Sequence, residues 1–549
     1  MKRFVINTFF WVWALILSSF HSYGQSLPVG SPVREDAVRR EQLLGIFDES
    51  VSLAIRPVST TAMLDSMHAK VNTFQLQPMP LIWKQQFNSD HPEGLDDGAM
   101  IPARGYQTMV SGGFFARYGA FSIQLMPELI YAENSDFQGF PDELSDDYWK
   151  EYYWGISNNI DMPEQFGRGA KTFVDWGQSS IRFTINPISI GISNENLWWG
   201  PGIKNALMMT NNAPGFKHIT LNTVRPIKTF LGSFEGQLVG GRLEASGYPN
   251  FDTIQLAQHG VTYAPKTKDW RYLNGLVVTY QPKWLPGLFL GATRSFISYS
   301  TGLGRSVSDY LPVIMPILKK IINGTEDAIP RDQLASVFLR WMAPESHSEF
   351  YFEYGREDHN YDVTDLLLEP DYSSAYIVGF RKLTPIKRNK KEYLDCQVEI
   401  TQLGKNLSTS YRANGASVWY RHTLVRDGYT NKGQYIGAGI GTSSNMQSAS
   451  LAWVKGLKRV GLDFKRVAHD EDFWAYVSKD YRTHWVDVGA ALFGDWDYKK
   501  FLFNARLETV GSINYQHLYA PVPSDPAYWW DDGKVRYNIH AELGMTYLF

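Results

Sequence analysis

Apolar and polar residues alternate from about residue 105 to the end of the chain, and this pattern limits the possible folds more than any other feature. The alternation is clear in residues 121–131, 394–400 and 501–508. Strict period two is typical of β-strands with one apolar and one polar face. Alternation alone does not separate a soluble sandwich from a membrane barrel, so other features must decide.

The end of the chain favours the membrane barrel. Seven apolar residues, Tyr537, Ile539, Ala541, Leu543, Met545, Tyr547 and Phe549, alternate with polar or small ones, and the sequence stops on an aromatic ring. Such a strand resembles the signal read by barrel-insertion machinery, which we therefore expect as a partner during biogenesis. The same strand would close the barrel and remove the open sheet edge that lipid cannot hydrate.

Composition supports this interpretation. Aromatic residues make up 15% of the 549, yet mean hydropathy is only −0.28. A barrel reconciles the two values, because alternate residues face lipid while the others line a wet lumen and rings gather at the interfaces. We predict an all-β transmembrane barrel with Arg506 and Glu508 pointing inward. The single cysteine, Cys396, excludes an intrachain disulfide framework.

The first residues resemble an export signal. Lys2 and Arg3 precede an apolar stretch over residues 4–20, and Ser22 and Gly24 occupy the −3 and −1 positions of a cut before Gln25. We predict a signal peptide over residues 1–24 and a location in the cell outer membrane. A transmembrane anchor is the alternative, but the stretch is short for a span.

Residues 25–95 have a different pattern, and we predict a partly helical periplasmic region or plug there, followed by the barrel over residues 96–549. A helix is expected over residues 33–44, with the Ser31 hydroxyl as its cap and Gly45 as its stop, and a second one near residues 61–70. Long irregular segments at residues 138–177, 301–332 and 515–533 are expected outside the cell, with a helix over residues 309–323. Tight turns at 117–119, 283–287, 455–459 and 494–499 are expected on the periplasmic side.

The most distinctive motif is GISNENLWWGPGIKNALMMTNNAPGFKHITLNT at residues 191–223. Together with residues 39–57, 99–127, 339–360 and 427–441, it resembles the Wzi-type capsule assembly family in its Bacteroidota-like form. This resemblance implies an outer-membrane barrel of about eighteen antiparallel strands, with a helical N-terminal region on the periplasmic side. It also implies a lectin that holds capsular polysaccharide at the cell surface, with no catalytic residues.

Within this motif, Glu195, Asn196, Trp198 and Trp199 form the candidate glycan-binding site. Pyranose rings present apolar C–H faces that stack on indoles, while amide and carboxylate groups bind hydroxyls. The alternative is that the two tryptophans are interfacial anchors or pack beneath a plug inside the barrel. Both interpretations remain open from the sequence.

Other functions have weaker support. A diffusion porin or glycan-uptake channel is the main alternative; bulky inward positions such as Met126, Leu502 and Trp419 favour a closed lumen instead.

Acidic and histidine-containing runs at 357–359 and 469–472 could bind a cation weakly, but we predict no metal site and no cofactor. The net charge of −3 gives no reason to expect nucleic acid. No motif fixes a catalytic pair, so an enzyme is not expected. Surface polysaccharide and outer-membrane lipid are the expected partners.

Overall fold

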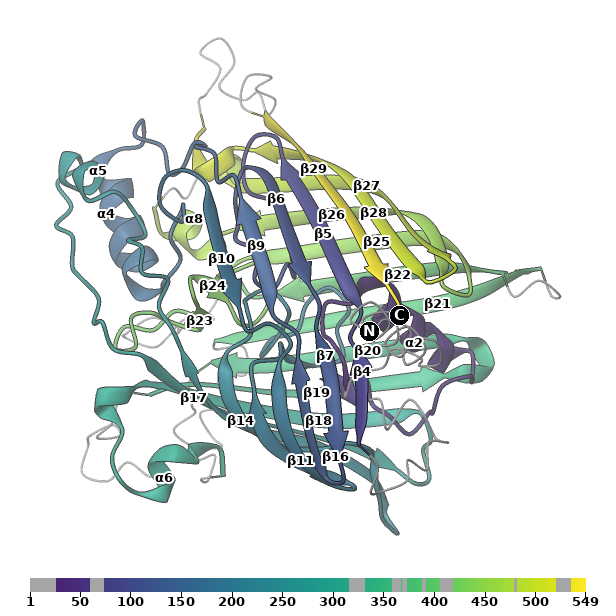
Figure 1. Ribbon diagram of the computed structural model, residues 1–549. Helices are drawn as coiled ribbons and strands as arrows, with labels where there is room; N and C mark the ends of the chain where they lie inside the picture. Colours follow the sequence, from purple (N-terminus) through teal and green to yellow (C-terminus); the bar gives the residue numbers. More distant parts are fainter. Residues whose placement is uncertain are drawn as a thin grey trace, which may run out of the picture.

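The computed structural model describes residues 26–59, 74–314, 331–357, 367, 373–387, 392–404, 418–477, 481–519 and 535–549. The predicted signal peptide and the predicted helix near residues 61–70 lie outside them. The described chain forms one large antiparallel sheet that closes into a barrel (Figure 1). No helix within the described ranges is long and apolar enough to cross a bilayer.

The barrel wall consists of segments that run up and down in chain order. They are β4 (Gln75–Pro78), β5 (Leu81–Asn88), β6 (Gly105–Ser111), β7 (Phe114–Tyr118), β8 (Phe121–Leu125), β9 (Glu128–Ala132), β10 (Lys171–Asp175), β11 (Ser180–Ile185), β12 (Ile188–Ser193), β14 (Lys217–Thr223), β15 (Ile227–Lys228), β16 (Gly232–Leu243), β17 (Arg271–Pro282), β18 (Leu288–Tyr299), β19 (Asp332–Ala343), β20 (Ser348–Glu357), β21 (Ser374–Lys387), β22 (Glu392–Gln402), β25 (Asn445–Lys455), β26 (Lys458–His469), β27 (Trp485–Tyr498), β28 (Phe501–Ile513) and β29 (Val535–Tyr547). In five places, β4/β5, β6/β7, β8/β9, β10/β11 and β14/β15, two consecutive segments are halves of one interrupted strand. Eighteen strands therefore surround the lumen in the described part of the chain, which confirms the predicted architecture.

The last strand closes the barrel, as its pattern predicts. β29 pairs with β5 from His540 opposite Asn88 to Tyr547 opposite Leu81, and Figure 1 shows the yellow β29 beside the purple β5. Along β29 the apolar side chains of Tyr537, Ile539 and Leu543 are exposed, while the alternate polar residues Asn538 and His540 are buried. The period-two pattern thus places apolar residues toward lipid and polar residues in the lumen.

The wall begins at Gln75, which corrects the predicted boundary at residue 96. In β5, Leu81, Trp83 and Phe87 are exposed outward while Gln86 and Asn88 are buried. Prolines 78 and 80 interrupt the alternation just before this strand. Proline cannot donate to a strand ladder, so the sequence there resembles a loop although the chain re-enters the wall directly afterwards.

The two ends of the barrel differ. At one end strands are joined by short turns, such as residues 119–120, 456–457 and 499–500; Gly119 and Gly456 have φ of +60° there, as two-residue hairpin turns require. The predicted turn at 494–499 is shorter than expected, because β27 continues to Tyr498. At the other end lie the long connections, although β10 already starts within the predicted loop 138–177. Short turns mark the periplasmic side of such barrels.

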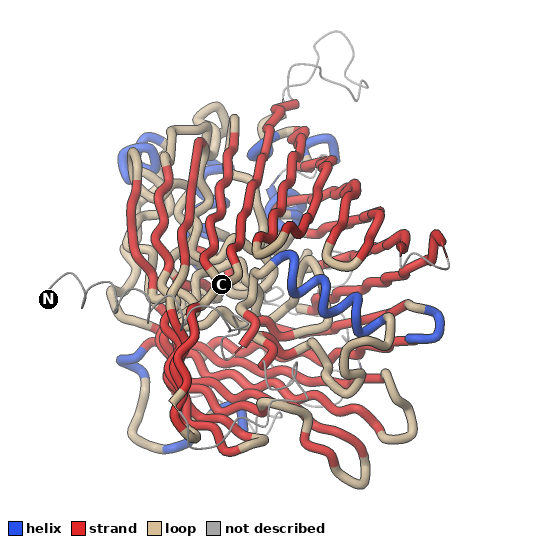
Figure 2. Tube along the Cα trace, turned by 45° about the vertical axis from the view of Figure 1, so that its right-hand side comes forward, coloured by secondary structure: helices blue, strands red, loops and turns tan. Residues whose placement is uncertain are grey.

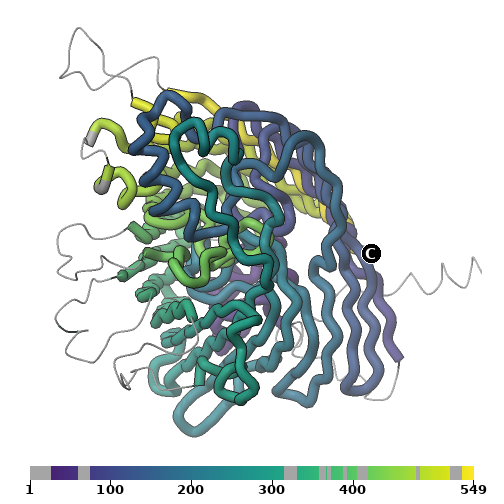
Figure 3. Tube along the Cα trace, turned by 90° about the vertical axis from the view of Figure 1, so that its left-hand side faces the viewer, coloured from purple at the N-terminus to yellow at the C-terminus, as the bar shows by residue number. Residues whose placement is uncertain are grey.

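Helices lie at both ends. They are α2 (Pro32–Leu43), α4 (Asp146–Gly155), α5 (Thr253–Gln258), α6 (Val307–Tyr310) and α8 (Glu471–Val477), with short 3-10 turns at Ser157–Asn159, Ser300–Gly302, Pro312–Ile314, Pro344–Ser346, Tyr481–Thr483 and Tyr515–His517. Of the helix predicted over residues 309–323, only the part up to Ile314 is described. Figure 2 shows α2 beside the C-terminus at the short-turn end, and Figure 3 looks onto the opposite end, where the loops carrying α4 and α5 lie in front.

The helix predicted at residues 33–44 is α2, displaced by one residue. Gly45 ends it with φ of +69°, as expected. The predicted Ser31 cap is wrong in one respect: its hydroxyl makes no cap bond, and its carbonyl instead accepts from Glu35 N at 3.0 Å.

An apolar core fills part of the lumen. Three parts of the chain fold into it: residues 26–59, which we term the plug; residues 194–216, the lumenal segment; and residues 418–444, the lumenal hairpin. The plug is joined to the lumenal segment by the pairing of β2 (Ile55–Arg56) with β13 (Trp198–Trp199). Within the plug, β1 (Ser26–Leu27) pairs with β3 (Val58–Ser59), and within the lumenal hairpin β23 (Thr430–Asn431) pairs with β24 (Gln434–Tyr435). Their apolar side chains pack together with inward residues of β16 to β21 in one buried cluster.

Candidate functional site

The four residues predicted to bind glycan all lie in the lumenal segment, and all four are buried. The segment leaves the wall after β12 and returns to it at β14, so the structure holds it inside the barrel. None of these side chains is exposed on the outside of the molecule. The interactions of each one show what it does inside the lumen.

Glu195 anchors the plug to the wall. Arg182 Nη2 on β11 donates to one carboxylate oxygen at 2.6 Å, and the hydroxyls of Ser26 and Ser193 donate to the carboxylate at 2.6 and 2.9 Å. Burial acts to raise the pKa of Glu195, but the Arg182 guanidinium holds it below its usual value. The carboxylate is therefore charged and fully engaged, as a buried charge must be.

Asn196 fixes the path of the lumenal segment. Its amide donates to Asn211 Oδ1 at 2.8 Å and to the Ala213 carbonyl at 2.9 Å, while Gln178 Nε2 donates to its Oδ1 at 3.0 Å. These bonds join the two arms of the segment to a loop of the wall. All the polar atoms of this side chain are thus used within the protein.

Trp199 packs into the wall. Its Nε1 donates to Gln237 Oε1 on β16 at 2.8 Å, and the side chain is 0% exposed. The ring lies so close to Gly275 on β17 that a Cβ there would be 2.8 Å from it. This contact requires glycine at 275 and leaves no room for a sugar on that side of the ring.

Trp198 differs from the other three because it lines a cavity. The Arg56 guanidinium lies 4.0 Å from its ring centroid, an arrangement that favours a cation over an indole face. Its Nε1 has no hydrogen-bond partner within the described residues. Trp198 is therefore the one of the four predicted residues that lines this cavity, and its indole N–H is buried without a partner among the described residues.

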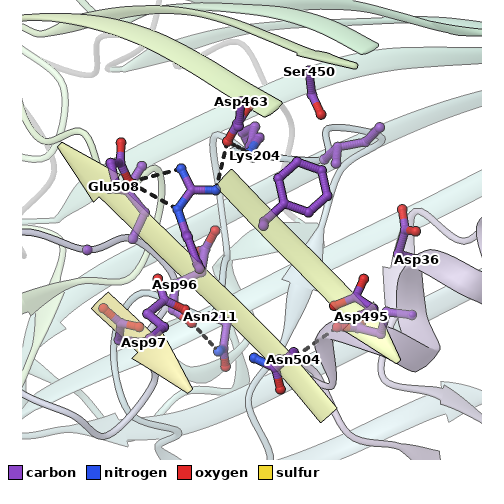
Figure 4. Close-up of a pocket in the computed structure, with 18 of the residues that line it drawn as sticks. Asp36, Asp96, Asp97, Lys204, Asn211, Ser450, Asp463, Asp495, Asn504 and Glu508 are labelled. Carbon is purple, nitrogen blue, oxygen red and sulfur yellow. Dashed lines mark hydrogen bonds and ion pairs between the residues drawn. The ribbon is translucent and has the colours of Figure 1, made fainter. Parts of the chain in front are cut away.

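The cavity has a volume of about 330 Å³ and lies between the plug, the loop after β5, the lumenal segment and the inner face of strands β22 to β29 (Figure 4). Its lining is strongly charged. Arg506 Nη1 lies 2.9 Å from Asp463, its Nη2 lies 2.9 Å from Glu508, and Lys204 Nζ contacts Asp463 at 2.7 Å. These ion pairs confirm that Arg506 and Glu508 point inward, and they make the cavity suited to a polar occupant.

Two adjacent carboxyl groups at the cavity have unusual acidity. Burial raises the pKa of Asp96 to about 8, and the neighbouring Asp97 carboxylate adds to this shift. Burial and the charge of Glu542 raise the pKa of Asp97 to about 6. Asp96 Oδ1 has no partner in the described chain. At neutral pH Asp96 is thus a protonated group that can donate a hydrogen bond.

A second candidate surface is the cap at the long-loop end. Phe140, Trp149 and Tyr153 from the loop of α4 pack with Phe251 near α5 and Phe473 of α8 in a buried aromatic cluster. Of these loops, the sequence predicts only that of α4, as part of the irregular segment 138–177. The run DYWKEYYWG over α4, in which every apolar residue is aromatic, was the available signal.

The cap also carries exposed rings. Trp154 is 48% exposed and Tyr263 is 38% exposed. Both adjoin Tyr153, whose ring lies 5.1 Å from that of Trp154 and whose hydroxyl accepts from Ala264 N at 2.7 Å. These two rings form what we term the cap pair.

The histidine and acidic run at 469–472 is occupied by protein contacts. His469 Nε2 lies 2.7 Å from Asp487, and Glu471 pairs with His484 at 2.9 Å. Within the described ranges no group of three or more such side chains could hold a metal ion. Asp358 and His359 of the other run lie outside the described residues.

Comparison with known proteins identifies the family. A sequence model described as capsule assembly protein Wzi matches residues 103–514. The chain belongs to the Wzi family. Consistent with this, it is an outer-membrane β-barrel. No curated protein sequence matches the chain significantly.

Solved structures include a Wzi from Escherichia coli described as a carbohydrate-binding β-barrel. It has a TM-score of 0.60 and 13% identity, covering 96% of this chain and 100% of that one. Acinetobacter baumannii OccAB2 has a TM-score of 0.41 with 10% identity over 86% of this chain and 98% of that one. Pseudomonas aeruginosa OprD has a TM-score of 0.39 with 7% identity over 87% of this chain and 95% of that one. The first of these likenesses shows a common fold with Wzi.

Proposed function

We propose that this protein binds capsular or other surface polysaccharide at the outer face of the outer membrane and organises it there without chemical turnover. Membership of the Wzi family supports this function. The E. coli Wzi of similar fold is described as an outer-membrane protein involved in group 1 capsule assembly and as carbohydrate-binding. The partners are the polysaccharide and membrane lipid, with barrel-insertion machinery during biogenesis; no cofactor or nucleic acid is needed.

The filled lumen is the observation that carries the proposal. Leu207 and Met208 of the lumenal segment and Trp419 and Tyr420 of the lumenal hairpin are at most 1% exposed. They pack against inward residues of the wall in a continuous apolar cluster. A diffusion channel needs a wet path through the lumen, and an apolar core in that place favours a binding role over conduction.

The cap pair is the glycan-binding surface that we propose. Trp154 and Tyr263 are exposed at the long-loop end, which faces the cell exterior. The Trp154 ring lies 5.1 Å from that of the buried Tyr153, and Tyr263 precedes Ala264, whose backbone N–H donates to the Tyr153 hydroxyl. A rigid base orients the rings in advance, which lowers the entropy lost on binding. Exposed ring faces suit the C–H faces of pyranoses, and nearby backbone and side-chain groups suit their hydroxyls.

The binding role of Glu195, Asn196, Trp198 and Trp199 stays a prediction. Because Glu195, Asn196 and Trp199 are saturated by protein contacts, we propose that they hold the lumenal segment in place. Trp198 lines the cavity and is therefore the member of the four that we propose can contact a sugar there.

The test measures affinity for the host's own capsular polysaccharide and ion conductance in planar bilayers with the same purified protein. Trp154→Ala and Tyr263→Ala should each weaken binding by about tenfold, the loss expected for roughly 1–2 kcal/mol per stacked ring. Trp284→Ala is the matched control, since this ring is 64% exposed at the short-turn end. Conductance should be small.

Three other results would contradict the proposal. Large, steady conductance without polysaccharide affinity would favour a porin or glycan-uptake channel. Turnover of glycan or phospholipid would make the protein an enzyme. Equal losses in the cap variants and the Trp284 control would remove the cap pair as the binding surface.

A further inference from the structure

The outer wall of the barrel has an apolar groove near the short-turn end. It is lined by outward-facing side chains of β5 and β26 to β29 around Gly494 and Ala505: the exposed Trp83, Val460, Trp496, Phe503 and Leu543, and the half-buried Met545. Its volume is about 440 Å³. We term it the wall groove. Since its lining residues are on the outward face of the strands, the groove opens toward lipid rather than toward the lumen.

The strand register explains how the groove forms. Trp496, Phe503, Met545 and Trp83 lie opposite one another in a single row across β27, β28, β29 and β5. The next outward-facing row, two residues further along each strand, contains Gly494, Ala505, Leu543 and Gln85. Two neighbouring positions in that row thus have almost no side chain. The row nearer the short turns has large side chains, and the next row contains Gly494 and Ala505, so the wall has a depression at these two small residues.

Ammonium groups lie at the short-turn side of this groove. Lys458 Nζ lies 4.3 Å from the centroid of the Trp496 ring, which itself lines the groove. Lys499 and Lys500 form the exposed turn between β27 and β28, and Lys499 Nζ lies 5.2 Å from the Tyr498 ring. The neighbouring cations Lys455 and Arg459 are paired with Glu392 and Asp495, and these ion pairs include none of the three lysines. They are positive charges at the level of an aromatic belt, where lipid head groups lie.

We propose that the wall groove and these three lysines form a binding site for one anionic glycerophospholipid of the periplasmic leaflet. The lysines would bind the phosphate group, and an acyl chain would run past Trp496 and Phe503 into the depression at Gly494 and Ala505. The positive charge of the lysines matches the anionic phosphate group of the lipid, and the apolar groove matches its acyl chain. Because the groove lies near the short-turn end, which is the periplasmic side of the barrel, the lipid belongs to the periplasmic leaflet. Figure 1 shows these strands next to the C-terminus.

Native mass spectrometry of the purified full chain, given equal amounts of dioleoyl phosphatidylglycerol and dioleoyl phosphatidylcholine, tests the site. The protein should retain one phosphatidylglycerol in preference. Each lysine changed to glutamine should weaken retention by about fivefold, because a basic residue near the membrane surface contributes roughly 1 kcal/mol to binding an anionic lipid. Lys228→Gln with Lys283→Gln is the control, since both are exposed at the same end of the barrel but near other strands. These changes should have no effect.

Ala505→Phe tests the groove separately. The residue faces lipid, so a larger apolar side chain should not disturb folding, which heat-modified gel mobility verifies. This variant should lose most of the retained lipid. Equal retention of phosphatidylglycerol and phosphatidylcholine would overturn the proposal. So would a loss of phosphatidylglycerol in the Lys228→Gln, Lys283→Gln control equal to the loss in the Lys458, Lys499 and Lys500 variants. Unchanged retention in Ala505→Phe would show that the groove holds no acyl chain. A protein dimer that Ala505→Phe dissociates, without bound lipid, would assign the groove to a second copy of the chain.

Discussion

Arg381 of the wall strand β21 donates to Asp36 of the plug helix at 2.7 Å, and the same guanidinium binds Asp395 of β22 at 2.7 Å. The ion pair between Arg381 and Asp36 joins two parts of the chain that are far apart in sequence. Burial acts to raise the pKa of Asp36, but Arg381 and Arg459 hold it well below its usual range. The plug is therefore attached to the wall by a buried charge.

Changing Arg381→Gln should release the plug. Two buried carboxylates would lose their common partner, and breaking a buried pair costs about 3–5 kcal/mol. We expect faster trypsin cleavage within residues 26–59 while the barrel remains folded. Arg242→Gln removes an exposed ion pair with Glu244 and should change stability by no more than about 0.5 kcal/mol. Equal cleavage rates in the two variants would contradict the anchoring role.

The two adjacent tryptophans should behave differently. Trp199→Ala removes a fully buried ring and the hydrogen bond to Gln237, so it should destabilise the barrel by about 3–5 kcal/mol. Trp198→Phe keeps an aromatic ring but removes the unused N–H, so it should leave the unfolding temperature nearly unchanged. Thermal unfolding followed by gel mobility distinguishes them. If Trp198→Phe weakens polysaccharide binding in a fully folded protein, the cavity contacts the glycan.

The cap should become less stable as pH rises. Burial raises the pKa of Glu164 to about 8, and its carboxyl accepts from Phe140 N at 2.6 Å. The folded cap binds this proton more tightly than the unfolded chain does, where the pKa is near 4.5. Stability from this group is complete below about pH 4.5 and is lost progressively up to about pH 8. The loss should be on the order of 2 kcal/mol, allowing for partial solvation.

Glu164→Gln provides the control, because an amide does not titrate. The ratio of chymotrypsin cleavage rates in loop 133–170, wild type over variant, should rise between pH 5 and pH 8. Comparing the two proteins at each pH cancels the pH dependence of the protease. A constant ratio would show that Glu164 does not control the stability of the cap.

The terminal ring should matter for membrane insertion. The ring centroid of Phe549 lies 5.1 Å from that of Tyr547, and Phe549 lines a second outward-facing apolar pocket with Leu81 and Val110. Phe549→Asp would place a charge on the lipid-facing surface beside the closing strand, which lipid disfavours. Membrane levels of the variant should fall severalfold, whereas Phe549→Tyr should insert normally. Normal levels of Phe549→Asp would show that insertion does not depend on the terminal ring.

Sequence alone predicted much of the wall. Period two assigns each residue of a strand to lipid or lumen, and it correctly placed Arg506 and Glu508 inside. The closing role of β29 also followed from its own residues. The start of the wall was missed because prolines 78 and 80 hide a strand that the neighbouring strands impose.

The candidate site was predicted less well. The sequence identified the unusual motif at residues 191–223, but an exposed sugar-stacking tryptophan and a buried packing tryptophan have the same local signature. Their environments depend on Gly275 and Gln237, which are many residues away. Likewise, the aromatic residues of α4 gave no sign that they would meet Phe251 and Phe473 in one cluster.

Local alternation determined on which face of the sheet each strand residue lies, because that face depends only on the residue's parity. The predicted export signal and the terminal strand then favoured a membrane barrel over a soluble sandwich. Tertiary structure decided that the lumen is filled, since that depends on which loops fold inward. Leu207 and Tyr420 lie in loops that could equally have extended outward; they meet inside because Tyr420 donates to the Leu207 carbonyl at 2.7 Å and both join the apolar core. Contacts between residues so distant in sequence leave no periodic trace in it, and they place an apolar core inside this barrel.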